Sequence, residues 1–134
     1  MELQVGVKAF LRNPEGKYLL LHRSPEQAAQ TKGSWDIVGG RINAGSLLID
    51  NLKREILEET SLVLESEPKL LYAQDIIPNE KRHVVRLTYL AEIKGEPALS
   101  DEHDTYKWVT AEEMKSQPDL DIYAKELLDK DIIS

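Results

Sequence analysis

The sequence predicts a mixed α/β fold, and two patterns carry that prediction. Apolar residues alternate from Leu3 to Leu11, which is typical of a strand with one buried face. Later in the chain, Leu48, Leu52 and Ile56 recur at helical spacing. A chain of 134 residues has room for about one domain, which we expect to span residues 1–134.

The other expected elements follow from local signals. Turn residues at 13–16 lead into a returning strand at 18–21, so the first two strands should form a hairpin. A short strand at 35–38 should stop at Gly39 and Gly40. Ser46 is a good N-cap for the helix that runs to about Thr60. Further strands are expected at 69–77, 83–93 and 106–109. A short helix should begin after Thr110, and Tyr123, Leu127 and Leu128 indicate a C-terminal helix.

Composition excludes several classes of function. Seventeen basic and twenty-four acidic residues give a net charge of −7, which disfavours nucleic acid as a partner. The absence of cysteine excludes a thiolate nucleophile and a thiolate zinc site. No apolar run approaches the roughly 18 residues of a membrane span, and the start at Met1 lacks a basic region before an apolar stretch. We therefore expect a cytoplasmic protein with no membrane association.

The end of the long helix concentrates negative charge. Glu55, Glu58 and Glu59 fall on one helix face, because residues three and four positions apart are neighbours. They also lie near the helix C-terminus, where the helix dipole is already negative. A solvated acidic face is the ordinary explanation for such a cluster. A hard divalent cation such as Mg²⁺ or Mn²⁺ would instead make the arrangement favourable, since it binds carboxylate oxygens.

These carboxylates belong to a longer pattern that follows a glycine-rich loop. In an unbroken register, the chain places a glycine at position 40, Arg-Glu-Ile at 54–56, Glu-Glu at 58–59 and leucine at 62. This segment resembles the signature of the Nudix hydrolase superfamily, and the order of elements resembles that family over most of the chain. Two positions depart from the signature: Ser46 replaces its first glutamate, and Ser61 replaces its glycine.

The resemblance implies an α/β/α sandwich around a mixed β-sheet, with the signature folded as loop-helix-loop. It also implies metal-dependent hydrolysis of a nucleoside diphosphate linked to another moiety, with Mg²⁺ or Mn²⁺ as cofactor. Glu55, Glu58 and Glu59 would supply the metal ligands and the base, and the Gly40 carbonyl would be a further ligand. Arg54 would orient a glutamate. Ser46 would cap the helix but would lose the ion pair that a glutamate could make with Arg54.

Three residues outside the signature are also candidates. In several family members a loop before the last strand brings another carboxylate to the metal, and Glu102 would fill that place; a solvated acidic loop is the alternative. Arg23, at the end of the second strand, would contact substrate phosphates, or it is a surface arginine. For His103 an ordinary surface role is expected.

The sequence thus predicts a pyrophosphohydrolase acting on a small-molecule nucleotide, either a nucleoside triphosphate or a nucleotide sugar such as ADP-ribose. A catalytically weak or inactive nucleotide-binding module is the alternative that Ser46 raises, and an interaction domain with a solvated acidic helix is a third. The sequence leaves open the substrate, the phosphorus attacked, the number of metal ions and the formation of a homodimer.

Overall fold

A computed structural model describes residues 1–28 and 33–134 of the chain. Within these residues, seven strands form one mixed sheet in the order β3-β2-β1-β6-β5, with β4 paired to β1 and β7 paired to β2. The strands are β1 (Glu2–Arg12), β2 (Tyr18–Arg23), β3 (Trp35–Asp36), β4 (Val38–Arg41), β5 (Lys69–Asn79), β6 (Arg82–Glu92) and β7 (His103–Val109). The helices are α1 (Pro25–Ala28), α2 (Leu48–Thr60), α3 (Ala111–Lys115) and α4 (Ile122–Asp129).

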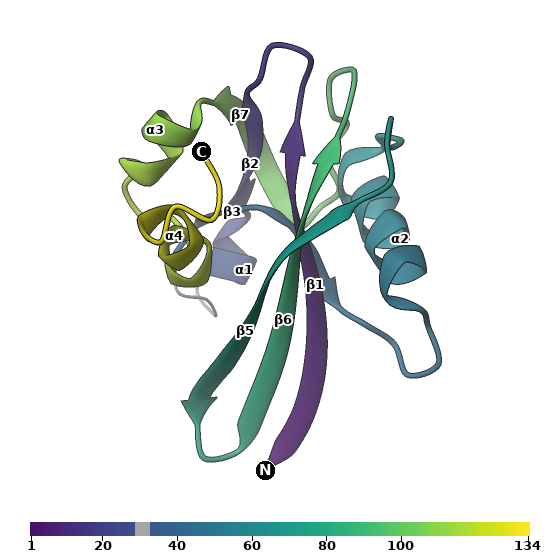
Figure 1. Ribbon diagram of the computed structural model, residues 1–134, viewed down its shortest axis with the longest axis vertical. Coiled ribbons are helices and arrows are strands. Elements are labelled where there is room, and N and C mark those ends of the chain that lie inside the picture. Colours follow the sequence, from purple (N-terminus) through teal and green to yellow (C-terminus); the bar gives the residue numbers. More distant parts are fainter. Residues whose placement is uncertain (29–32) are drawn as a thin grey trace.

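Helices cover both faces of the sheet, with α2 on one side and α3 and α4 on the other (Figure 1). This confirms the predicted α/β/α arrangement. On one side, Leu52 and Ile56 of α2 pack in a cluster with the alternate residues Val7, Ala9 and Leu11 of β1. On the other side, a second cluster joins α3 and α4 to the sheet through residues that include Phe10, Met114 and Leu127. Successive side chains of β1 therefore point to opposite faces of the sheet and contribute to two hydrophobic cores.

The first two strands form only the beginning of a hairpin. β1 and β2 pair at Arg12 and Tyr18, after which β2 pairs with β7. β1 instead pairs in parallel with β6 along its whole length and antiparallel with β4 from Gly6 to Ala9. The expected two-strand hairpin was wrong beyond its turn, because long-range pairing partners take both edges of β1.

The glycines after Val38 continue a strand rather than end one. β4 runs through Gly39 and Gly40 to Arg41, so the expected stop was wrong. A Cβ atom at Gly39 would lie 2.1 Å from the Val7 carbonyl oxygen, and φ of Gly39 is 134°. Glycine is required there because β4 and β1 approach more closely than any side chain allows.

The long helix forms where the apolar spacing predicts it, but Ser46 is not its cap. Leu47 occupies the N-cap position of α2 and makes no side-chain cap hydrogen bond. The Ser46 amide donates to the Asn43 carbonyl at 2.9 Å in the preceding turn. By contrast, the predicted capping box at the start of α3 is confirmed, since Thr110 and Glu113 make both of its hydrogen bonds.

Candidate active site

The last turns of α2 bring the predicted carboxylates to one place beside β4. Buried Leu52 and Ile56 hold the inner face of the helix against the sheet. Ser61 ends the helix in the left-handed region, with φ of 61°, and its amide donates to the Leu57 carbonyl at 2.9 Å. The position at which the family signature has glycine therefore has the backbone geometry that favours glycine.

Glu59 is the most deeply placed of the three carboxylates. Its residue is 6% exposed, and its Oε2 accepts a hydrogen bond from the Gly39 amide at 3.0 Å. Burial raises the pKa of Glu59 to about 8, although nearby Lys8 acts in the opposite direction. A carboxylate is costly in such surroundings unless a cation shares the site.

Glu55 packs directly against the glycine backbone of β4. A Cβ atom at Gly40 would lie 3.2 Å from Glu55 Oε1, a contact tighter than side chains normally make. Burial also raises the pKa of Glu55, with contributions from Glu58 and Glu102 in the same direction. Glycine at position 40 thus leaves space in which the Glu55 carboxylate and the Gly40 backbone can face one ligand.

The start of β7 supplies two more ligand-bearing side chains. Single ligand atoms of Glu59, Glu102 and His103 all lie within 4.8 Å of one another. Hydrogen bonds fix this approach: the Ser100 amide donates to the Glu59 carbonyl at 3.4 Å, and the Ser24 amide donates to the Glu102 carbonyl at 2.9 Å. The prediction that Glu102 lies near the helix carboxylates therefore agrees with the structure, and its role as a ligand stays a prediction.

His103 occupies a different environment from the one expected. Its Nδ1 atom is buried and has no hydrogen-bond partner among the described residues. Burial, together with the positive charge of Lys8, lowers the pKa of His103 to about 4, so the ring is neutral near pH 7. The residue is half-buried, and one of its ring nitrogens lies within 4.8 Å of carboxylate oxygens of Glu59 and Glu102, so its surroundings differ from those of an ordinary surface histidine.

The donor set fits a divalent cation. Carboxylate oxygens come from α2 and from the segment before β7, and one ring nitrogen of His103 lies within 4.8 Å of an oxygen from each. Oxygen ligands suit Mg²⁺ and Mn²⁺, and an imidazole nitrogen is a better ligand for transition metals than for Mg²⁺. The buried Glu59 carboxylate would recover in such a site the stabilisation that burial removes.

Arg54 links the glutamates on the outer side of the helix. Its Nη1 donates to both carboxylate oxygens of Glu58, at 3.0 and 3.2 Å, and its Nη2 donates to Glu55 Oε1 at 3.3 Å. The Glu58 side chain is 58% exposed, so this contact is what orients it. These contacts are those that the orienting role implied by the resemblance would need, and the role itself stays a prediction.

Arg23 has partners that the sequence did not indicate. Its guanidinium donates to Asp36 and to the Gly33 carbonyl, and it lies 3.5 Å from Asp121. Lys8 pairs with the same Asp36 carboxylate at 2.8 Å. Burial alone would raise the pKa of Asp36, but Lys8 and Arg23 outweigh it and lower this pKa to about 2. A phosphate contact by Arg23 would require these ion pairs to exchange, so that role remains a prediction.

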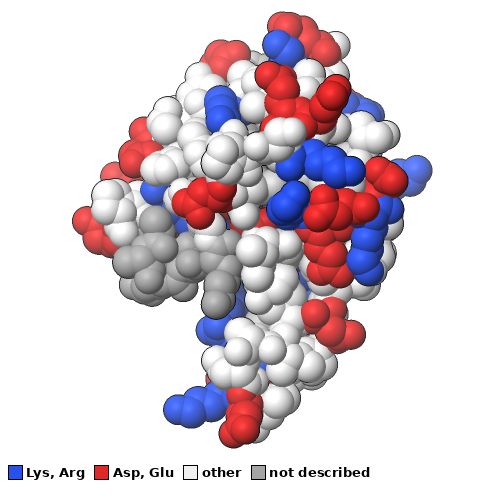
Figure 2. All heavy atoms as spheres, turned by 90° about the vertical axis from the view of Figure 1, so that its left-hand side faces the viewer, with Lys and Arg blue, Asp and Glu red and all other residues white. Residues whose placement is uncertain are grey.

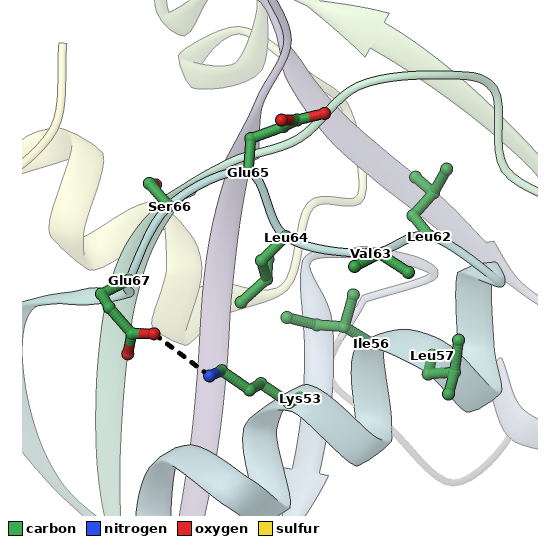
Figure 3. A pocket seen from close by; sticks show the side chains of 9 residues that line it. All are labelled: Lys53, Ile56, Leu57, Leu62, Val63, Leu64, Glu65, Ser66 and Glu67. Atoms are coloured by element: carbon green, nitrogen blue, oxygen red, sulfur yellow. Dashed lines mark hydrogen bonds and ion pairs between the residues drawn. The ribbon is translucent and has the colours of Figure 1, made fainter.

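A separate pocket lies between α2 and the segment that follows it (Figure 3). It has a volume of about 490 Å³ and combines apolar side chains with a Lys53–Glu67 ion pair at 3.2 Å. None of the candidate carboxylates lines it.

The face that carries α3 and α4 shows acidic and basic side chains interspersed (Figure 2).

Comparison with known proteins agrees with this fold. The NUDIX domain matches residues 2–130 of the chain. A MutT protein from Methanosarcina mazei Go1 is 25% identical, with a TM-score of 0.81 over 96% of this chain and 91% of that one. A MutT NUDIX hydrolase from Burkholderia pseudomallei is 27% identical, with a TM-score of 0.77 over 99% and 100%. The E. coli ORF135 protein, 21% identical with a TM-score of 0.78 over 96% and 88%, shares the fold. No curated protein matches significantly.

Fold and site together define a hydrolase of phosphoric anhydride bonds. The chain belongs to the Nudix family, whose members typically depend on a divalent metal. No helix within residues 1–28 and 33–134 has both the length and the apolar character that a bilayer span requires.

Proposed function

We propose that this protein is a Mg²⁺- or Mn²⁺-dependent pyrophosphohydrolase that cleaves a nucleoside diphosphate linked to another moiety. A nucleoside triphosphate and a nucleotide sugar such as ADP-ribose are the two substrate types to test. The observation that carries the proposal is the convergence of Glu59 with Glu102 and His103, beside the Glu55 carboxylate and the backbone of Gly40.

The proposed ligand set divides by location. Glu59 and Glu102 would hold the cation on the inner side, where the His103 ring offers a nitrogen. The ligand set would be completed nearer the solvent by Glu55, Glu58 and the Gly40 carbonyl. A bound divalent cation would spread the negative charge of the pyrophosphate and lower the pKa of a water molecule.

The chain's own side chains then account for the proton and for orientation. In the proposed step, the water oxygen forms a bond to phosphorus, the anhydride P–O bond breaks, and a carboxylate takes the water proton. Glu55 and Glu58 are the candidates for this base, because Arg54 holds both carboxylates and Glu58 stays accessible to solvent. Arg54 would act by keeping their oxygens aimed at the site.

Ser46 provides the reason to test a second function. The family signature has a glutamate at this position, and serine carries no negative charge. The Ser46 side chain also makes no hydrogen bond among the described residues. A module that binds a nucleotide without cleaving it would retain the metal ligands and lose turnover. Product analysis distinguishes the two functions, whereas metal binding alone does not.

The test is a panel of nucleoside triphosphates, nucleotide sugars and dinucleoside polyphosphates, incubated with Mg²⁺ and separately with Mn²⁺. Phosphate and nucleotide release would be measured for the wild-type protein, for Glu58→Gln and for Glu65→Gln, an exposed glutamate outside the cluster. We expect at least one substrate to be cleaved by the wild type and by Glu65→Gln. Glu58→Gln should lower kcat by about 100-fold or more, as loss of a general base typically does. Unchanged activity in Glu58→Gln would refute the assignment, and binding without cleavage would favour the second function.

A further inference from the structure

The side chain of Asn51 connects two parts of the site that are distant from it in sequence. Asn51 is 0% exposed and lies on α2 one turn before Arg54. Its Oδ1 accepts hydrogen bonds from the Asn43 amide and from Arg54 Nη2, both at 3.1 Å. Its Nδ2 donates to the Arg41 carbonyl at 3.5 Å. One buried amide thus joins the chain just after Gly40 to the arginine that orients the glutamates.

Arg54 depends on its acceptors for a defined position. Its side chain is 38% exposed, and a long exposed side chain samples many rotamers unless hydrogen bonds restrain it. Nη1 is held by Glu58, whose own side chain is more exposed still. Nη2 is held by Glu55 and by Asn51. Asn51 is the buried and therefore the most rigid of these acceptors.

The family signature has a glutamate at position 46, and this chain has no carboxylate there. Position 46 carries serine, and within the described residues the Ser46 side chain has no hydrogen bond to Arg54 or to any other group. Asn51 provides an oxygen acceptor to Arg54 from the helix itself. The same oxygen also binds the loop amide of Asn43, so the acceptor is fixed on both sides.

We propose that Asn51 is a positioning residue for Arg54, and through Arg54 for Glu55 and Glu58, in place of the glutamate that this chain lacks at position 46. The inference rests on the proposed function for its catalytic meaning. It differs from a purely structural role, in which Asn51 would only satisfy the Asn43 amide and the Arg41 carbonyl. Both roles predict some loss of stability when the amide is removed, because buried backbone groups lose a partner.

The experiment compares the wild type with Asn51→Leu, Asn51→Asp and Ser46→Glu/Asn51→Leu. Leucine has a similar size and no polar atoms, whereas aspartate keeps an oxygen acceptor for Arg54. Arg54→Gln, alone and combined with Asn51→Leu, completes a double-mutant cycle. The measurements are kcat and KM on the best substrate of the panel, the Kd of Mn²⁺ by calorimetry without nucleotide, and the melting temperature.

We expect Asn51→Leu to lower kcat and Mn²⁺ affinity by about 10- to 100-fold, with little change in KM. Asn51→Asp should stay within about threefold of the wild type in kcat, because a carboxylate oxygen also accepts from arginine. Adding Ser46→Glu to Asn51→Leu should recover kcat without recovering the melting temperature. In the Arg54→Gln background, Asn51→Leu should change kcat and Mn²⁺ affinity by less than about twofold.

Three results would overturn the inference. One is additivity: Asn51→Leu lowers kcat as much in the Arg54→Gln background as it does in the wild type. Another is a lowered melting temperature with kcat and Mn²⁺ affinity unchanged. The third is an activity of Asn51→Asp as low as that of Asn51→Leu in a folded protein. If the wild type cleaves no substrate, the proposed function fails, and the same cycle measured on Mn²⁺ affinity still decides the role of Asn51.

Discussion

Glu59 Oε2 lies 3.0 Å from the Gly39 amide nitrogen, so the helix and the neighbouring strand β4 meet through a carboxylate and a backbone donor. Because Gly39 lacks a side chain, β4 can approach β1 closely. The contact fixes one ligand of the proposed cation before the cation arrives. It also leaves a buried carboxyl group whose ionisation costs free energy, and this cost should be measurable in the metal-free protein.

The first prediction concerns that cost. Burial places the pKa of Glu59 near 8 in the folded protein, above the ordinary value of 4.5. The folded state therefore favours the protonated acid, and the metal-free protein should lose stability as pH rises from about 4.5 to 8. Glu59→Gln should remove this part of the pH dependence. Chemical denaturation at a series of pH values in EDTA measures it, with Glu15→Gln, an exposed glutamate of the first turn, as the control. Parallel curves for Glu59→Gln and the wild type would contradict the prediction.

The second prediction concerns binding of the metal. Millimolar Mg²⁺ or Mn²⁺ should raise the melting temperature of the wild type, because a ligand that binds only the folded state stabilises it by mass action. The effect should saturate, and it should disappear in Glu59→Gln while persisting in Glu15→Gln. Thermal unfolding at increasing metal concentrations provides the measurement. An interaction domain with a merely solvated acidic helix would show no saturable effect.

His103 should influence which metal is preferred. An imidazole nitrogen favours Mn²⁺ and other transition metals relative to Mg²⁺. Replacing His103 with glutamine, which keeps polarity but removes the imidazole, should weaken Mn²⁺ binding more than Mg²⁺ binding. Calorimetry with each metal gives the ratio of the two dissociation constants, and His83→Gln, at a histidine on β6, serves as the control. An unchanged ratio would exclude His103 from the ligand set.

The ion pairs of Asp36 with Lys8 and Arg23 should contribute strongly to the free energy of unfolding. Asp36 is 1% exposed and pairs with Lys8 and Arg23. Asp36→Asn should lower the free energy of unfolding by about 3–5 kcal/mol, because Lys8 loses its carboxylate partner and Arg23 keeps only the longer ion pair with Asp121. Asp129→Asn, at an exposed pair with Lys125, should cost less than about 0.5 kcal/mol. Urea denaturation compares the two variants, and equal losses would contradict the distinction.

The same pair predicts the response to acid. The pKa of Asp36 is lowered to about 2 from 3.8, so its contribution is present above pH 3.8 and is lost as pH falls through 2. The free energy of unfolding of the wild type should therefore fall in this range by more than that of Asp36→Asn. Two parallel acid titrations would show that Asp36 is not ionised in the folded protein.

The strained helix end offers a test that should leave function intact. Ser61→Gly should raise the free energy of unfolding by up to about 1 kcal/mol, since glycine adopts positive φ without steric cost. The gain is reduced by loss of the hydrogen bond from Ser61 Oγ to the Ala98 carbonyl at 3.3 Å. Mn²⁺ affinity should not change, because Ser61 offers no ligand to the cluster. Ser61→Ala is the matched control and should be slightly less stable than the wild type.

Local sequence patterns predicted much of the fold and, within the candidate site, the carboxylates of α2. The helix at 48–60 and its three carboxylates could be predicted because apolar spacing and charge spacing are properties of a single segment. The pairing of β1 with β6 joins residues that are 80 positions apart, so neither strand's own sequence predicts it. For the same reason the turn signal at 13–16 suggested a longer hairpin than the structure has.

Residues whose role depends on distant partners escaped the sequence analysis. Lys8 lies between the apolar positions of the first strand, and nothing in that local pattern indicates its ion pair with Asp36 of β3. Asn51 lay within an apolar helical repeat and gave no signal beyond being a polar residue on that helix. A polar residue that falls among the apolar positions of a helix, next to a charged motif, is the pattern that could have drawn attention to it.

The central claim is that a divalent cation sits among the carboxylates of α2 and the start of β7. Anomalous diffraction from crystals soaked in manganese, in a lattice that leaves the site open, tests it most directly. The account predicts an anomalous peak within bonding distance of Glu59 and Glu102, with Glu55 turned toward it. Side chains directed into solvent, with no peak near them, would contradict it.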